Sequence, residues 1–263
     1  RHGSLDWGAK IGNVWFQAFR ENYVSAINTH PPSAAQINAV KAKMDAERPA
    51  GEPTMLVVHR STNAGYVSEW DRTAITTTTE ALDTSETGID MTSVAGLSLG
   101  QYFHIDDEEF GPITDITALT VTAARAQSST IAATHNSGAS VYRTDALDAL
   151  YALAASKNTI GLLNGHNHYD RHETWRGYRA FSPGSVTQGQ GAGGNPATPP
   201  YGVVYAEAFN VLRIFNGGGN SVYDVANYNF GFNLNRPLAG GTYGGTGWAP
   251  GTWNWYERVR YTP

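Results

Sequence analysis

Short apolar runs recur along the chain, and each is followed by a turn rich in glycine or polar residues. Three of them, residues 54–58, 130–134 and 159–163, consist of small, β-branched and aliphatic side chains. Runs of this length with turn residues on both sides predict buried strands. We therefore expect the core of the protein to be built on a sheet.

Apolar positions at helical spacing predict helices between these strands. Ser33 and Gln36 form a capping box ahead of an apolar stripe that ends before Pro49. Residues 145–155 begin with an acidic residue and carry leucines on one face, which also predicts a helix. The apolar residues of 13–27 lie close to helical spacing as well. The pattern favours an α/β protein.

The helix predicted over 145–155 lies between two of the predicted strands, so the three form a strand-helix-strand unit. Its two strands should be parallel, because such a crossover joins parallel neighbours. His135 directly follows the first strand, and His166 and His168 follow the second after a glycine. Carboxyl ends of parallel strands meet at one edge of a sheet, where open α/β folds place their sites. Since imidazole is the commonest metal ligand in proteins, we predict a metal site there.

The remaining chain predicts peripheral elements. Residues 106–109 are four consecutive acids, a run that is typical of a solvated loop. Apolar runs at 201–206, 210–215 and 221–226 are separated by turn residues and predict an antiparallel meander. From residue 227 onward the chain is rich in glycine and aromatic residues. We expect one domain over residues 1–226, with residues 227–263 packed on it as a tail.

The histidine region carries a family resemblance. Residues 164–171 read Asn-Gly-His-Asn-His-Tyr-Asp-Arg, which resembles the Gly-His-x-His signature of calcineurin-like metallophosphoesterases in its purple acid phosphatase form. Residues 175–185 are similar to the return strand and Gly-Ser turn of that family. His135 and Asn136 resemble its preceding histidine motif, so the resemblance extends over residues 125 to 225.

This resemblance implies a β-sandwich flanked by helices, in an α/β/β/α four-layer order. It also implies metal-dependent hydrolysis of a phosphomonoester or phosphodiester, in which two cations of Mn, Zn or Fe activate a hydroxide. By the resemblance, His135 and His166 serve one cation, and His168 and Asp6 serve the other. These four residues are the expected metal-binding and catalytic set.

The resemblance also suggests residues around the metals. His59, Asn136 and Arg171 are candidates for contact with the substrate, and Asp170 is placed to orient a ligand imidazole. His59 stands where the second motif of that family has a metal-bridging aspartate. The third motif, Gly-Asn-His followed by an acid, has no counterpart in residues 73–93.

Two other interpretations of the function remain open. Residues 28–30, the helix from Gln36 and the strand at 56–58 resemble the middle of a DNase I-like phosphodiesterase, which would use a single Mg or Ca. A catalytically impaired relative that binds a carbohydrate or other ligand through the aromatic tail is the second reading. The number and kind of bound metal ions distinguish the three.

The amino-acid composition limits the classes of molecule that are expected to bind. Formal net charge is −5 and only 16% of the 263 residues are charged, so no basic face for nucleic acid is expected and nucleic acid enters only as substrate. The expected partner is a small phosphoester. Cysteine is absent, which excludes disulfides and thiolate metal sites. Few lysines and many polar and aromatic residues favour a secreted or periplasmic enzyme. No run is long enough to span a membrane, and Arg1 in place of a start methionine suggests a processed or truncated product.

Overall fold

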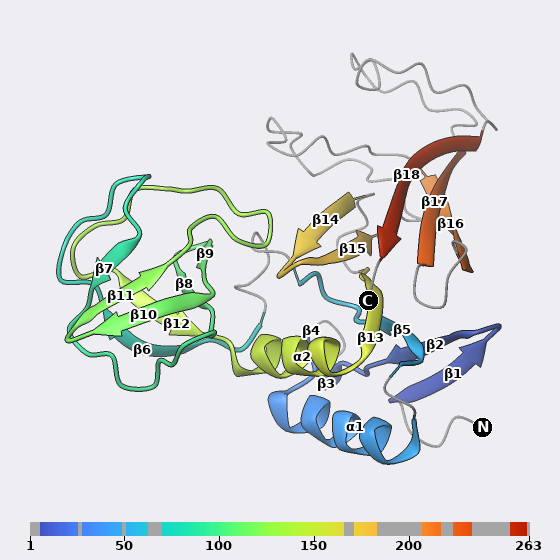
Figure 1. Cartoon of the computed structure of the whole chain (residues 1–263), viewed down its shortest axis with the longest axis horizontal. Coiled ribbons are helices and arrows are strands. Elements are labelled where there is room, and N and C mark those ends of the chain that lie inside the picture. The colour runs from blue at the N-terminus through green and yellow to red at the C-terminus, as the bar shows by residue number, and fades with distance from the viewer. Residues whose placement is uncertain are drawn as a thin grey trace.

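The chain forms two lobes, which lie side by side in Figure 1. The computed structural model describes residues 6–25, 28–48, 51–62, 70–165, 171–182, 207–216, 223–232 and 253–261. The large lobe contains both described helices and a mixed sheet, and the small lobe is formed by strands between residues 73 and 143. The fold is mixed α/β, and most of its elements are strands.

The large lobe is organised around a six-stranded sheet. Its four central strands run parallel and its two outer strands are antiparallel to their neighbours. In spatial order the strands are β1 (Trp7–Ile11), β2 (Val14–Ala18), β5 (Pro53–Val57), β13 (Asn158–Leu163), β15 (Tyr178–Ser182) and β14 (Arg171–Trp175). The predicted strands at 54–58 and 159–163 are thus confirmed, and the structure shows that they are adjacent and parallel.

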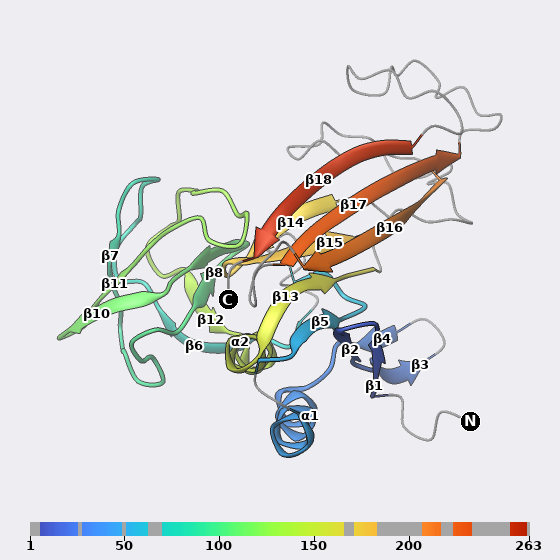
Figure 2. The same cartoon turned by 45° about the vertical axis from the view of Figure 1, so that its right-hand side comes forward.

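Two helices cover one face of this sheet (Figure 2). Helix α1 (Ala34–Glu47) begins at Ser33, whose hydroxyl oxygen accepts a hydrogen bond from the backbone N–H of Gln36, as the capping box predicts. Helix α2 (Asp145–Ser156) confirms the second predicted helix and buries the leucine face seen in the sequence. The helices pack against each other and against the sheet in one apolar core.

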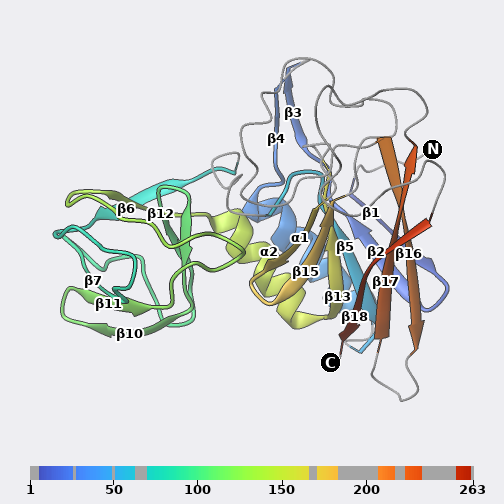
Figure 3. The same cartoon turned by 90° about the horizontal axis from the view of Figure 1, so that it is seen from above.

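A second sheet covers the opposite face, as the view from above shows (Figure 3). Val14, Met55, Ile160 and Phe181 form an apolar cluster on this face and are buried. The covering sheet is antiparallel and contains β16 (Glu207–Asn216), β17 (Tyr223–Phe232) and β18 (Trp253–Tyr261). The predicted boundary at residue 226 falls inside β17, and the tail contributes β18 to the same sheet.

The small lobe has its own core. It is inserted between β5 and α2, and its buried residues, among them Phe103, Phe110 and Val141, form a separate apolar cluster. One sheet contains β6 (Thr73–Thr77), β12 (Ser140–Arg143), β8 (Phe103–Ile105) and β9 (Glu108–Phe110). The other contains β10 (Ile113–Thr117), β11 (Thr120–Ala123) and β7 (Gly88–Asp90).

The helix predicted over residues 13–27 is wrong. This stretch forms β2 and β3 (Asn22–Ser25), and β3 pairs with β4 (Asn28–His30). Both faces of β2 are covered, since Trp15 packs toward the helices and Val14 toward the second sheet. A strand buried on both faces lacks the polar alternation that identifies a strand in a sequence.

Two further predictions need correction. Residues 130–134 form no strand, and His135 instead makes an isolated bridge with Leu82 of the small lobe. The acidic run is only half solvated, because Asp106 and Asp107 are exposed whereas the next two glutamates are buried in β9. Neither α1 nor α2, the helices in the described part of the chain, is long and apolar enough to cross a bilayer.

Candidate functional site

The carboxyl ends of the parallel strands β5 and β13 lie side by side, and polar residues follow both. The ladder continues past the strands, because the backbone N–H of Val58 donates to Leu163 O at 2.9 Å and that of Gly165 donates to His59 O at 2.7 Å. On the far side, the N–H of Asn164 donates to Phe181 O at 2.8 Å. These bonds hold His59 beside Asn164 and Gly165 at one edge of the sheet.

Gly165 allows a close approach of the His59 side chain. A Cβ atom at residue 165 would lie 3.2 Å from Nδ1 of His59 and 3.5 Å from its carbonyl oxygen. The 3.2 Å separation is tighter than ordinary van der Waals contact, so a side chain at residue 165 would require the imidazole to shift by a few tenths of an ångström. Gly165 therefore keeps His59 close to the backbone of the residue that directly precedes His166-Asn167-His168.

Asn164 was not among the sequence-predicted site residues. Its side chain is buried, and its Nδ2 lies 3.4 Å from the hydroxyl oxygen of Thr62, which is also buried. Its carbonyl oxygen Oδ1 has no hydrogen-bond partner within the described residues. A buried acceptor without a donor is unusual, and this oxygen is able to accept a hydrogen bond from a ligand or to contact a cation. Asn164 begins the stretch that resembles the Gly-His-x-His signature, but nothing in the sequence shows that its side chain is buried without a donor.

Ion pairing and hydrogen bonding fix the segment after β5. The guanidinium of Arg60 donates from Nε to Glu21 Oε1 at 3.1 Å, which joins this segment to the chain that follows β2. The indole N–H of Trp70 donates to Ser61 O at 2.8 Å, and the indole is buried. The backbone around His59 is consequently held from both sides.

Asp6 lies at the same edge of the sheet, next to the end of β2. Its Oδ1 accepts the backbone N–H of Arg20 at 2.8 Å and the side-chain amide of Gln36 at 2.6 Å. Asp6 also lines a pocket of about 290 Å³ between α1 and the β1–β2 hairpin, together with Trp15 and other residues. In the described structure, Asp6 therefore fastens α1 to the sheet.

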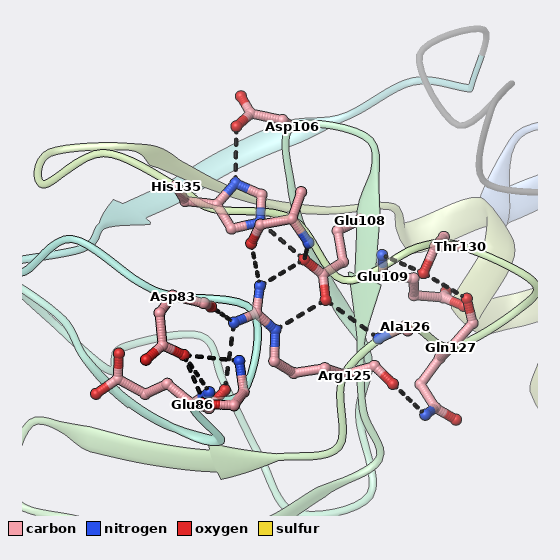
Figure 4. Close-up of polar contacts among 12 residues, drawn as sticks. Asp83, Glu86, Asp106, Glu108, Glu109, Arg125, Ala126, Gln127, Thr130 and His135 are labelled. Carbon is pink, nitrogen blue, oxygen red and sulfur yellow. Dashed lines mark hydrogen bonds and ion pairs between the residues drawn. The ribbon is translucent and has the colours of Figure 1, made fainter.

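The structure does not bring His135 to this edge. His135 lies in the small lobe, where Nδ1 is 2.9 Å from Asp106 Oδ2 and Nε2 is 2.9 Å from Glu108 Oε2 (Figure 4). The placement differs from the prediction because the strand expected before His135 is not formed. Asn136, the predicted substrate contact, lies in an exposed turn of the same lobe.

Both ring nitrogens of His135 and both carboxylate oxygens of Glu108 have partners in a polar network (Figure 4). Arg125 donates to both carboxylate oxygens of Glu108, at 2.9 and 2.7 Å, and the backbone N–H of Ala133 donates to Oε2 at 3.0 Å. Burial alone would raise the pKa of Glu108, but these hydrogen bonds and the one with His135 outweigh it and lower the pKa. The network therefore stabilises the charged carboxylate of Glu108 in the interior of the small lobe.

Several predicted residues lie outside the described residues. These are His166, His168 and Asp170, so the pairing of His168 with Asp6 stays a prediction. Arg171 is the first residue of β14, where its backbone pairs with Ser182. Within the described ranges, no three His, Asp or Glu side chains are grouped in a way that would hold a metal ion.

At the carboxyl edge of β5 and β13, His59 thus lies beside Gly165 and the buried, unpaired acceptor of Asn164. The sequence His166-Asn167-His168 follows directly along the chain. Comparisons of the chain with protein-family models, with curated proteins and with solved structures found no match.

Proposed function

We propose that the protein is a metal-dependent hydrolase of phosphoesters whose site lies at the carboxyl edge of β5 and β13. The observation that carries the proposal is the contact between His59 and Gly165, the residue directly before His166. It indicates that His59, rather than His135, is the partner of His166 and His168. The four-layer metallophosphoesterase fold belongs to this proposal, and the order helices, sheet, second sheet in the described residues supports three of its layers.

The side chains at this edge are of the kinds that coordinate transition-metal cations. Imidazole and carboxamide oxygen are ligands that Mn, Zn and Fe accept, and the buried Oδ1 of Asn164 needs an electrophilic partner. His59, Asn164, His166 and His168 would hold the cations. Bound cations would supply the Lewis acid that polarises the phosphoryl group and the hydroxide that attacks it.

The protein's own residues would orient the reaction. Gly165 keeps the His59 imidazole close to the backbone, and the pair of Arg60 with Glu21 fixes the segment that carries it. Arg171, at the start of β14, is the proposed contact for the substrate phosphate, because a guanidinium matches phosphate geometry. Asp170 would orient one of the ligand imidazoles through its second ring nitrogen.

The test uses the full chain, a generic aryl phosphate and an aryl phosphodiester. Hydrolysis is expected, with loss after chelation and recovery when Mn, Zn or Fe is restored. Up to two transition-metal ions per chain should accompany activity in elemental analysis. Hydrolysis that survives exhaustive chelation, or that recovers only with Mg or Ca, would remove this proposal.

A further inference from the structure

A row of polar side chains crosses the outer face of the small-lobe sheet. Tyr142, His104 and Glu109 are paired directly across β12, β8 and β9, so their side chains share one face. His104 is fully buried and Glu109 is 1% exposed, although both are polar. The opposite face of these strands belongs to the small-lobe core. The row therefore lies on the face that is turned away from the small-lobe core.

Arg176 enters this row from the large lobe. It lies in the turn between β14 and β15, and its Nε and Nη2 lie 2.9 and 2.8 Å from Glu109 Oε1. Its Nη1 donates to Asp148 Oδ1 of α2 at 2.8 Å. The guanidinium also faces the ring of Tyr102 at 4.2 Å, and Tyr102 meets Tyr151 of α2 edge to face at 5.5 Å. One side chain thus joins the small lobe to two elements of the large lobe.

His104 lies beside this ion pair without a hydrogen bond. Its Nε2 is 3.5 Å from Glu109 Oε1, and neither ring nitrogen has a hydrogen-bond partner within the described residues. Oε2 of Glu109 also lacks such a partner. A protonated ring would be able to donate to Glu109, whereas the neutral ring leaves this carboxylate to Arg176.

The charges around His104 come from both lobes. The pKa of His104 is lowered to about 4, chiefly by burial; Glu109 opposes this shift, and Arg176 and Arg72 contribute to it. Burial also raises the pKa of Asp148, while Arg176 opposes that shift. At neutral pH the imidazole is therefore uncharged and Asp148 is paired with Arg176. Acid changes the charge of both groups.

We propose that His104, Glu109, Arg176 and Asp148 form an acid-sensitive latch that holds the two lobes together at neutral pH and releases them in acid. One proton added to His104 creates a second cation beside Arg176, and both cations then share the charge of Glu109. A proton added to Asp148 removes the other anion that Arg176 contacts. The two lobes have separate apolar cores, so each keeps its own packing when the contact between them is lost.

Small-angle X-ray scattering of the full chain, followed from neutral pH into acid, tests the latch. Histidine-selective NMR on the same sample follows the His104 imidazole. The chain should expand in step with the protonation of His104, before either core unfolds. A chain that stays compact until the imidazole is fully protonated, or that expands only as both cores unfold, would overturn the proposal.

Matched variants sharpen this test. His104→Gln keeps a neutral polar side chain, so its expansion should shift by about one pH unit or more toward acid. His30→Gln, at a half-exposed histidine, should keep the wild-type midpoint. Asp148→Asn removes one partner of Arg176 at every pH, so its expansion should begin at higher pH. Asp148→Asn also tests the latch if His104→Gln does not fold. An unchanged pH midpoint of expansion in Asp148→Asn would contradict the latch.

Discussion

His59 of the large lobe and His135 of the small lobe occupy opposite kinds of polar environment. Both nitrogens of His135 face carboxylates, and Glu108 is saturated by Arg125 and a backbone amide. At the carboxyl edge of β5 and β13, by contrast, His59 is held against Gly165, and the neighbouring Asn164 buries an acceptor without a donor. A saturated network stabilises a fold, whereas the unsatisfied oxygen of Asn164 leaves an acceptor for the proposed ligand or ion.

The largest expected effect on stability is in the small lobe. Arg125→Met would leave Glu108 as a buried charge without its cation, so the free energy of unfolding should fall by about 3–5 kcal/mol. Urea unfolding measures this loss. Lys41→Met removes a partly exposed partner of the surface residue Asp45 and should cost far less. If the two variants were equally stable, Glu108 would not be the charged centre of a structural network.

Acid should weaken the protein through His104. Its pKa is about 4 in the folded chain against 6.5 for an ordinary histidine, so the unfolded chain binds the proton more tightly. The free energy of unfolding should therefore be unaffected by this group above the ordinary pKa. It should fall as the pH drops toward the folded value, by roughly 3 kcal/mol in total.

Urea unfolding at a series of pH values measures this dependence. His104→Gln should flatten the slope in that pH window, because the titrating ring is removed. His30→Gln should keep it, since that side chain is half exposed. A His104→Gln slope equal to that of the wild type would show that other groups cause the acid sensitivity.

A smaller effect is expected from Gly165→Ala, and on turnover more than on stability. The new Cβ would lie 3.2 Å from Nδ1 of His59, so the imidazole would have to shift by a few tenths of an ångström. Misplacement of a catalytic group by about 1 Å can cost up to about 100-fold in rate, so this smaller shift should lower turnover severalfold, to about tenfold at most. Gly88→Ala is the matched control, because its Cβ would meet only Thr120 at 3.7 Å. Equal turnover in both variants would show that the position of His59 does not matter for hydrolysis.

The sequence predicts the framework of the large lobe well. Helices α1 and α2 and strands β5 and β13 have strong local signals, namely a capping residue, an amphipathic face and short apolar runs. Strand β2 is missed because both of its faces are buried, so its apolar residues imitate helical spacing. The run at residues 130–134 imitates a strand, although its backbone pairs with no neighbouring strand.

The sequence predicts only part of the candidate site. The order of strands decides which histidines meet, and that order depends on contacts between residues about 100 positions apart, such as Gly165 with His59. His135 is close to His166 in sequence but belongs to another core. The buried pair of Glu109 with Arg176 is equally hidden, because an acidic run gives no sign that alternate members point to opposite faces of a strand.

Metal content and turnover of point variants, measured on the same preparations, test the central claim most directly. His59→Ala and His166→Ala should each retain the fold by circular dichroism and lose bound transition metal and phosphoester hydrolysis together. His172→Ala, which lies beyond the Gly-His-x-His sequence, should lose much less of both. His135→Gln should keep metal and turnover per folded molecule. Wild-type metal content in His59→Ala, or loss of metal in His135→Gln alone, would contradict a metal centre at the carboxyl edge of β5 and β13.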